Sequence, residues 1–174
     1  IPFMLATVWA AERYLDDERP AAAILIGICA GLAWVMRFQS ITFGAGMGLA
    51  LLVLSQRRML AAFGFSAGFA IIVAAQGVLD LATWGSFLQS FRKYVDFNLI
   101  QDGAARFFGR SPWDFYLKRF ELVLPAMLLY PAALMLLWSF WRRRELLLAL
   151  PLVLFAALHF WTPHKEHRFL FPVY

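Results

Sequence analysis

Apolar residues follow one another in long runs along this chain, and short polar breaks separate the runs. A helix that crosses a lipid bilayer needs about 20 mostly apolar residues, with a range of roughly 17–25. The runs predict six transmembrane helices, at 1–15, 21–36, 41–54, 59–79, 121–141 and 145–161. We therefore expect an all-α, polytopic integral membrane protein, in which 1–174 is one transmembrane domain and a piece of a longer chain.

Three segments depart from this simple pattern. The runs 21–36 and 41–54 are short for full spans, so they form either a tight hairpin or a partly re-entrant segment shielded by protein. The segment 80–120 mixes polar and aromatic residues. Within it, 85–97 places aromatic residues on one helical face and charged residues on the other. This pattern is typical of a helix that lies in the membrane interface.

Composition and charge agree with a membrane protein. The hydrophobic fraction is 62% and the mean hydropathy is +0.66, whereas soluble domains are roughly 45–50% apolar. The net charge of +5 arises mainly from basic residues at the ends of apolar runs, where membrane proteins place them. No nucleic-acid motif accompanies them, so we exclude nucleic acid as a partner. The single cysteine, Cys29, can build neither a disulfide framework nor a thiolate metal site.

The basic clusters also predict an orientation. The short loops at 57–58 and 142–144 are compact and basic, so the positive-inside rule places both in the cytoplasm. Arg37, the segment 80–120 and the cluster 164–168 then face the extracytoplasmic or lumenal side. The segment 80–120 holds six Lys or Arg residues against four Asp residues, which is unusual on that side. These cations are explained if they bind an anion.

Polar residues at the ends of the runs are the candidates for chemistry. Arg37 stands between two apolar runs, where a cation either snorkels to the interface or contacts an anion. Five ionisable residues follow the last run: His164, Lys165, Glu166, His167 and Arg168. Two of them are histidines at i, i+3, but a catalytic zinc usually has three protein ligands. We therefore expect no metal and no other cofactor.

The cluster 164–172 resembles the HKEERFLFP-type motif of glycosyltransferase family 22, the mannosyltransferases of GPI-anchor and lipid-linked oligosaccharide assembly, with His167 where the family has Glu. Arg37 resembles the arginine of an Arg-Pro-Thr-like turn in that family, with Phe38 and Gln39 in place of Pro and Thr. The segment 80–120 is similar to the family in an ordered series of residues: Asp80, Trp84-Gly85, Asn98, Phe108-Gly109, Pro112-Trp113 and Tyr116.

The resemblance implies a multi-span fold of the GT-C type and an inverting transfer of mannose. It implies a polyprenyl- or dolichyl-phosphate sugar donor, a glycan or lipid-linked acceptor, and contact with membrane lipid. It implies a multi-pass protein of the bacterial inner membrane or endoplasmic reticulum, with its active face extracytoplasmic or lumenal. The family's acidic catalytic base lies in a first extracytoplasmic loop, which we expect N-terminal to Ile1, so the catalytic residue is unknown in this chain.

The same resemblance suggests roles for the substrate-binding candidates. Arg168, Lys165 and Arg37 are expected to contact the donor phosphate, because Arg binds phosphate in a bidentate fork and Lys acts as a point charge. His164 would add a hydrogen-bond donor, and Glu166 would orient one of these cations. The pocket for the sugar or acceptor would be shaped by Asp80, Trp84 and Asn98.

Two other functions stay open. A transporter or flippase of a lipid-linked sugar would also need anion contacts, but it predicts inverted repeats and ionisable residues near the bilayer midplane. The sequence shows no such repeat, and its ionisable residues gather at the ends of runs. A non-catalytic membrane subunit predicts instead that the polar cluster tolerates substitution.

Overall fold

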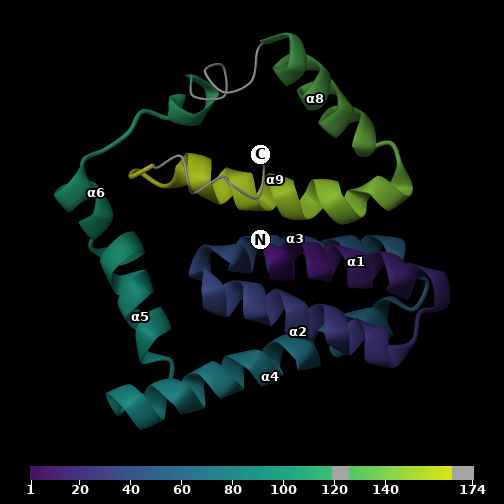
Figure 1. The fold of residues 1–174 in the computed structure, drawn as a ribbon, viewed down its shortest axis with the longest axis horizontal. Helices are drawn as coiled ribbons and strands as arrows, with labels where there is room; N and C mark the ends of the chain where they lie inside the picture. The colour runs from purple at the N-terminus through teal and green to yellow at the C-terminus, as the bar shows by residue number, and fades with distance from the viewer. Residues whose placement is uncertain (119–125, 166–174) are drawn as a thin grey trace.

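The structure is a computed structural model and describes residues 1–118 and 126–165. Within these residues it contains helices and no strand, which confirms the all-α expectation (Figure 1). The elements are α1 (Pro2–Asp17), α2 (Pro20–Met36), the 3-10 turn η1 (Phe38–Ser40), α3 (Ile41–Leu54), α4 (Arg58–Trp84), α5 (Gln89–Val95), the π-helical turn η2 (Asp96–Ile100), α6 (Gly103–Phe108), α8 (Ala126–Ser139), the 3-10 turn η3 (Arg143–Glu145) and α9 (Leu146–Trp161).

The long helices coincide closely with the apolar runs, although α4 continues past the predicted end at 79 to Trp84. Among the described residues, α4 is the one helix that is both long and apolar enough to cross a membrane. Shorter apolar helices lie at Pro20–Met36, Phe38–Leu54 and Leu146–Trp161. The sequence therefore predicts these helices correctly. That the chain crosses a membrane six times stays a prediction.

The closest helix packing joins α2 to α4 through glycines. A Cβ atom on Gly27 would lie 2.0 Å from the carbonyl oxygen of Phe65, and one on Gly68 would lie 2.1 Å from that of Ile24. Only glycine allows the two backbones to approach this far. Small residues at helix crossings are typical of membrane proteins, where helices associate by close packing rather than by the hydrophobic effect.

The remaining helices pack around this pair. α1 contacts α2, and α3 packs chiefly against α9. The largest buried cluster contains side chains from all five helices, among them Tyr14, Ile26, Met47, Leu51, Ala61 and Leu147. A second cluster lies nearer the beginning of α1 and the end of α9, and includes Met4, Phe43, Tyr116 and Phe155.

The connections gather at two opposite ends of the bundle (Figure 1). The loops after α1, α3 and α8 lie at one end. The Glu18 carboxylate there accepts hydrogen bonds from Ser55 Oγ at 2.9 Å, from the backbone N–H of Gln56 at 2.7 Å and from that of Arg57 at 3.1 Å. At the same end Arg144 pairs with Asp16 at 3.1 Å. The two basic clusters therefore share one end of the molecule, as the positive-inside rule requires.

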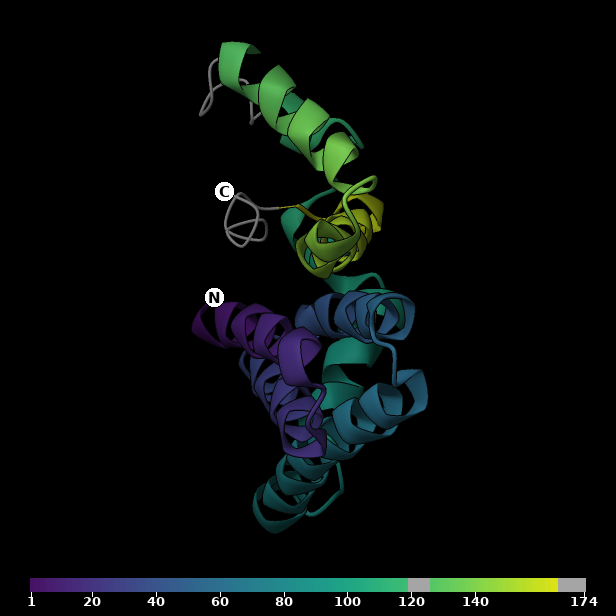
Figure 2. The same ribbon diagram turned by 90° about the vertical axis from the view of Figure 1, so that its right-hand side faces the viewer.

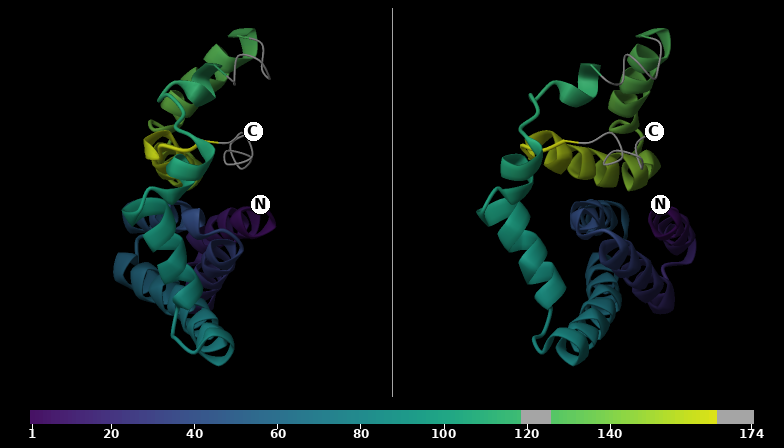
Figure 3. Two further views of the ribbon diagram at one scale, coloured as in Figure 1. Left: turned by 90° about the vertical axis from the view of Figure 1, so that its left-hand side faces the viewer. Right: turned by 60° about the vertical axis from the view of Figure 1, so that its left-hand side comes forward.

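The opposite end carries η1, the start of α5 and the end of α9, and α5 and α6 extend along it (Figure 3). The amphipathic helix starts later than the predicted 85–97 and continues from α5 through η2 to Ile100. It begins at Gln89, because Gly85 takes a left-handed φ of 75° and ends α4. Phe87 then folds back onto Gly77, where a Cβ atom would lie 2.1 Å from the ring. Of the predicted aromatic face, Phe91 contacts the Trp34 ring with centroids 5.3 Å apart and Tyr94 contacts the Phe38 ring, but Phe87 lies before the helix.

Two helices leave much apolar surface uncovered. α8 projects away from the bundle and touches mainly α9 (Figure 2). Large apolar side chains are exposed on both α4 and α8: Phe63, Ile71, Val78, Leu79, Leu81, Tyr130, Leu134, Met135, Leu137 and Trp138. Uncovered apolar surface of this extent marks contact with lipid or with other protein. The apolar character of α4 is therefore not explained by burial in a core.

Candidate functional site

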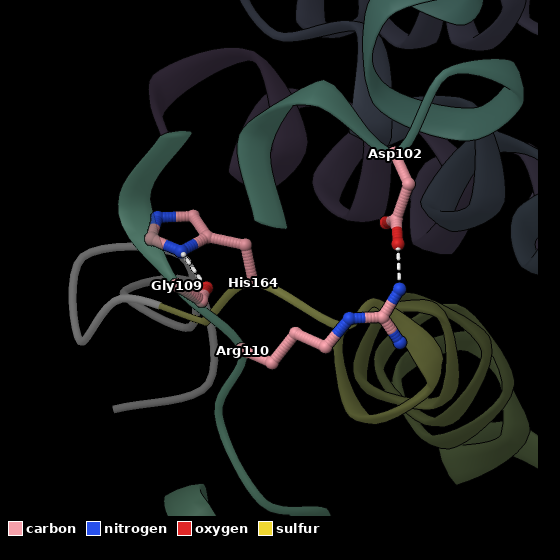
Figure 4. A network of polar contacts seen from close by, with 4 residues as sticks. All are labelled: Asp102, Gly109, Arg110 and His164. Carbon is pink, nitrogen blue, oxygen red and sulfur yellow. Dashed lines mark hydrogen bonds and ion pairs between the residues drawn. The ribbon is translucent and has the colours of Figure 1, made fainter. Parts of the chain in front are cut away.

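The end of α9 is fastened to the loop that follows α6. His164 Nδ1 lies 3.1 Å from the carbonyl oxygen of Gly109 (Figure 4). The His164 ring packs on Phe108 with centroids 5.5 Å apart. A carbonyl oxygen can only accept, so Nδ1 is the donor. The backbone N–H of Ser111 donates to the carbonyl of Pro163 at 2.8 Å. These contacts join residues 108–111 to residues 163–165.

The loop after α6 owes its shape to a glycine and an ion pair. Gly109 has a φ of 87° and a ψ of 162°, a backbone region that is essentially reserved for glycine. The next residue, Arg110, pairs with Asp102, which precedes the first residue of α6 (Figure 4). The ion pair therefore joins the residue after Gly109 to the residue before α6. It helps to place the chain that follows α6 next to His164.

Lys165 is the buried cation of this region. Its side chain is 5% exposed, and its Nζ donates to the carbonyl oxygen of Ser111 at 3.4 Å. Among the described residues this long hydrogen bond is its single polar contact. Burial lowers the pKa of the Lys165 ammonium group. A buried charge with so little compensation is unfavourable, and a bound anion would relieve the cost.

A small cavity of about 50 Å³ lies between three parts of the chain. Its lining includes Gln39 of η1, Tyr94 and Asn98 of the α5–η2 helix, Asp102, and Thr162 and His164 after α9. Asn98 Nδ2 donates to the Tyr94 carbonyl at 2.9 Å, which fixes its side chain. Pockets for small ligands usually measure roughly 300–1,000 Å³. The residues that line this cavity therefore pack around a gap that is too narrow to hold a sugar.

Arg37 follows the last residue of α2 and lines a different pocket of about 320 Å³, together with Met4 and Ser40. Its Nε donates to Gln39 Oε1 at 2.7 Å, and its Nη2 lies 3.4 Å from His159 Nε2. The guanidinium carbon stands 5.7 Å from the centroid of the Phe155 ring. Sequence reasoning missed His159, although an ionisable residue within an apolar run is a signal of function.

Tyr94 connects Arg37 to the amphipathic helix. Its ring packs against Phe38 with centroids 5.3 Å apart, and its hydroxyl hydrogen-bonds with the side chain of Gln39. Burial raises the pKa of Tyr94, while the charge of Arg37 and the hydrogen bond with Gln39 act in the opposite direction. The end of α2 and the helix α5 are therefore coupled through polar as well as aromatic contacts.

Asp80 holds the beginning of α5 against the end of α4. The carboxylate is 2% exposed, and it accepts from Gln76 Nε2 at 2.9 Å, from Ser90 Oγ at 2.6 Å and from the Ser90 backbone N–H at 2.8 Å. Trp84, also on α4, is 67% exposed. Neither residue lines the cavity beside His164 as far as the described residues show it. Their predicted roles in substrate binding stay predictions.

Comparison with known proteins identifies the family. The sequence model of the Alg9-like mannosyltransferase family matches residues 3–174, almost the whole chain. This chain belongs to the Alg9-like mannosyltransferase family. The resemblance inferred from 164–172 and from the segment 80–120 is thereby confirmed.

Two curated relatives of this family agree. The chain is 32% identical over 116 residues to GPI mannosyltransferase 3 of Eremothecium gossypii. This alignment covers 62% of the chain and 19% of the relative. It is 25% identical over 187 aligned positions to alpha-1,2-mannosyltransferase ALG9 of Mus musculus. This alignment covers 98% of the chain and 30% of the relative. The chain thus spans less than a third of the length of either relative. No solved structure matches it.

The structure brings together several of the residues that carry the likeness to the Alg9-like family. Gly109 and His164 are in contact, and Asn98 lines the cavity with His164. Glu166 and Arg168, two predicted substrate contacts, lie outside the described residues, as does His167. Among the described residues no group of three His, Cys, Asp or Glu side chains could hold a metal ion.

Proposed function

We propose that this chain forms part of the donor site of a membrane-embedded mannosyltransferase. The enzyme transfers mannose from a polyprenyl- or dolichyl-phosphate donor to a hydroxyl group of a glycan or lipid-linked acceptor, with inversion at the anomeric carbon. Membership of the Alg9-like mannosyltransferase family supports mannose as the sugar that is transferred. The relatives' names, a GPI mannosyltransferase and an alpha-1,2-mannosyltransferase, support a glycan or lipid-linked acceptor.

The observation that carries the proposal is the environment of Lys165. Its ammonium group is buried beside Ser111 and next to His164, with one long hydrogen bond as its described polar contact. A phosphate oxygen placed there would accept from Nζ at close range and would oppose the lowering of the lysine pKa that burial causes. The donor phosphate is the anion that this reaction supplies.

The chemistry needs three contributions. The acceptor oxygen forms a bond with C1 of mannose as the bond from C1 to the phosphate oxygen breaks, and the electron pair leaves with the phosphate. A base takes the acceptor's proton, and it is not assigned to a residue of this chain. Lys165, Arg168 and Arg37 stabilise the charge that grows on the leaving phosphate. Glu166 orients one of these cations.

A membrane setting accounts for the rest of the surface. The uncovered apolar side chains of α4 and α8 would contact lipid. The basic clusters at one end of the bundle would face the cytoplasm. The opposite end, with His164, Lys165 and the α5–α6 segment, would then face the extracytoplasmic or lumenal side. The helix α5 would lie in the interface there and guide the lipid tail of the donor toward the site.

Transfer by the full-length protein in membrane vesicles tests this function. Radiolabelled mannose is supplied either as polyprenyl-phosphate mannose or as GDP-mannose, in vesicles without other mannosyltransferases. We expect a labelled glycan or glycolipid product from the lipid donor alone, and loss of that product in Arg168→Ala. Use of GDP-mannose would contradict the lipid-phosphate donor. Passage of the intact labelled donor across the bilayer without transfer would identify a flippase instead.

A further inference from the structure

His159 lies in the last turn of α9 and is 1% exposed. Its Nδ1 is 2.7 Å from the backbone carbonyl oxygen of Phe155, one turn earlier. A carbonyl oxygen only accepts hydrogen bonds, so Nδ1 carries the proton. The Phe155 ring packs against the imidazole with centroids 4.3 Å apart. Both contacts fix the tautomer and the plane of the ring.

The other ring nitrogen faces Arg37. In a neutral imidazole with its proton on Nδ1, Nε2 carries a lone pair and accepts. A guanidinium group only donates, so the 3.4 Å contact runs from Arg37 Nη2 to His159 Nε2. A histidine protonated on both nitrogens could not accept this bond. The geometry therefore suits a neutral His159.

Three of the groups that contact the guanidinium group of Arg37 are uncharged. Gln39 Oε1 accepts from Nε at 2.7 Å, His159 Nε2 accepts from Nη2, and the Phe155 ring lies 5.7 Å from the guanidinium carbon. Together they restrict the orientation of the cation. A residue that must stabilise a leaving phosphate needs a fixed orientation as well as its charge.

We propose that His159 is a positioning residue that holds the guanidinium group of Arg37 in the orientation that serves the donor phosphate. The inference rests on the proposed function, because it requires Arg37 to act on that phosphate. Support of this kind by a neighbouring hydrogen bond is how sites keep reacting groups within a fraction of an ångström of a productive geometry. His159 itself touches neither donor nor acceptor.

A matched pair of substitutions separates this role from simple core packing. The amide of glutamine can place its oxygen near the position of Nε2, so His159→Gln keeps an acceptor for Arg37. The shorter asparagine reaches only the position of Nδ1, so His159→Asn keeps the bond to Phe155 and loses the acceptor. Both variants introduce a polar side chain of similar character into the same buried position. A packing role therefore predicts that both are impaired, with no advantage for glutamine.

The test measures kcat and KM for polyprenyl-phosphate mannose with full-length protein, with thermal unfolding of each variant as a check on folding. We expect His159→Gln to stay within about threefold of wild type, and His159→Asn to lose about 10–100-fold in kcat/KM, the effect of one hydrogen bond to a charged group. In an Arg37→Ala background the two variants should no longer differ, because the partner is gone.

Several results would overturn the role. Equal activities for His159→Gln and His159→Asn would do so, and so would a difference that persists in the Arg37→Ala background. Should His159→Asn not fold, Arg37→Lys examines the same contact, because an ammonium group keeps the charge and loses the fork. That variant should lose at least about tenfold, and adding His159→Gln should then change nothing further. A wild type that transfers no mannose at all would instead contradict the proposed function itself.

Discussion

The imidazole of His164 and the carbonyl oxygen of Gly109 lie 3.1 Å apart, although 55 residues separate them along the chain. This hydrogen bond fastens the residues that follow α9 to the loop that follows α6. Beside it, the Ser111 carbonyl provides the hydrogen bond of the buried Lys165 ammonium group. Two segments with likeness to the same family therefore form one polar structure at one end of the bundle.

The conformation of Gly109 gives a first prediction. Its φ of 87° with a ψ of 162° strains any residue that carries a side chain, at a cost of about 1–3 kcal/mol. Gly109→Ala should relieve the strain by shifting the loop away from His164 and should lower mannose transfer several-fold. Gly85→Asn is the matched control, because its φ of 75° and ψ of 7° lie in the left-handed region that asparagine tolerates. Equal transfer rates for both variants would contradict the prediction.

The carboxylate of Asp80 gives a second prediction. It accepts two hydrogen bonds from Ser90 and one from Gln76. Removal of the carboxylate should therefore first change the position of α5, which carries Ser90. Asp80→Ala should lower transfer strongly, and Ser90→Ala, which removes only the hydroxyl, should lower it less. The double variant should resemble Asp80→Ala, since both changes break one interaction. If Ser90→Ala is silent, or if the two effects add in the double variant, Asp80 acts on the substrate instead.

Much of the helical architecture follows from the sequence because apolar runs of this length have few alternatives. The runs placed α1 to α4 and α9 within a few residues. The positive-inside rule placed the two basic clusters at one end, where Glu18 contacts Arg57 and Asp16 contacts Arg144. Phe91 and Tyr94 of the predicted aromatic face both contact the Phe38 ring. These features depend on composition and spacing, which a sequence displays directly.

Other features depend on contacts between distant residues. The start of α5 was placed four residues too early, because the fold of Phe87 onto Gly77 is a tertiary contact with no local signal. The pairing of Arg37 with His159 joins residues 122 positions apart. The likeness to a family suggested that Arg37, Asn98 and His164 belong to one site, but it could not show that Gln39 and Tyr94 connect them.

The crossing of α2 and α4 gives a third prediction, on folding. A side chain at position 68 would meet the backbone of Ile24 at 2.1 Å, so Gly68→Val should force the helices apart. We expect the free energy of unfolding to fall by at least about 3 kcal/mol, the upper range for overpacked sites. This should be seen as a lower thermal unfolding midpoint and less monodisperse protein in detergent. Gly44→Ala is the control, because its Cβ would meet the Phe69 ring at 3.7 Å and the Ala30 Cβ at 3.9 Å, both ordinary contact distances. Similar behaviour of the two variants would contradict the close packing.

Glu18 gives a fourth prediction, on pH. Partial desolvation raises its pKa, but the hydrogen bonds from Ser55 and from the backbone of Gln56 and Arg57 outweigh this, so the pKa of the folded state is lowered. A lowered pKa adds stability above the ordinary value of about 4.3, and this stability disappears as the pH falls through the folded pKa. Glu18→Gln should therefore lower the unfolding midpoint by about 2–5 °C at pH 7.

The difference between Glu18→Gln and wild type should shrink steadily as the pH is lowered below about 4. Asp17→Asn provides a control at the same end of the bundle, since the Asp17 ion pair with Arg19 is largely exposed and such pairs contribute little. A midpoint difference for Glu18→Gln that does not change with pH would show that the carboxylate's charge is not what stabilises these loops.

The central claim is that Lys165 contacts the donor phosphate, and one measurement tests it most directly. Mannose transfer from polyprenyl-phosphate mannose is compared between wild type, Lys165→Met and Lys118→Met, with the full-length protein in membranes. Methionine removes the charge and keeps an apolar side chain of similar length at this buried position, so the variant should still fold. Lys118, which is 69% exposed, is the control. We predict at least about a tenfold loss of kcat/KM for Lys165→Met alone, and transfer at the wild-type rate by that variant would contradict the claim.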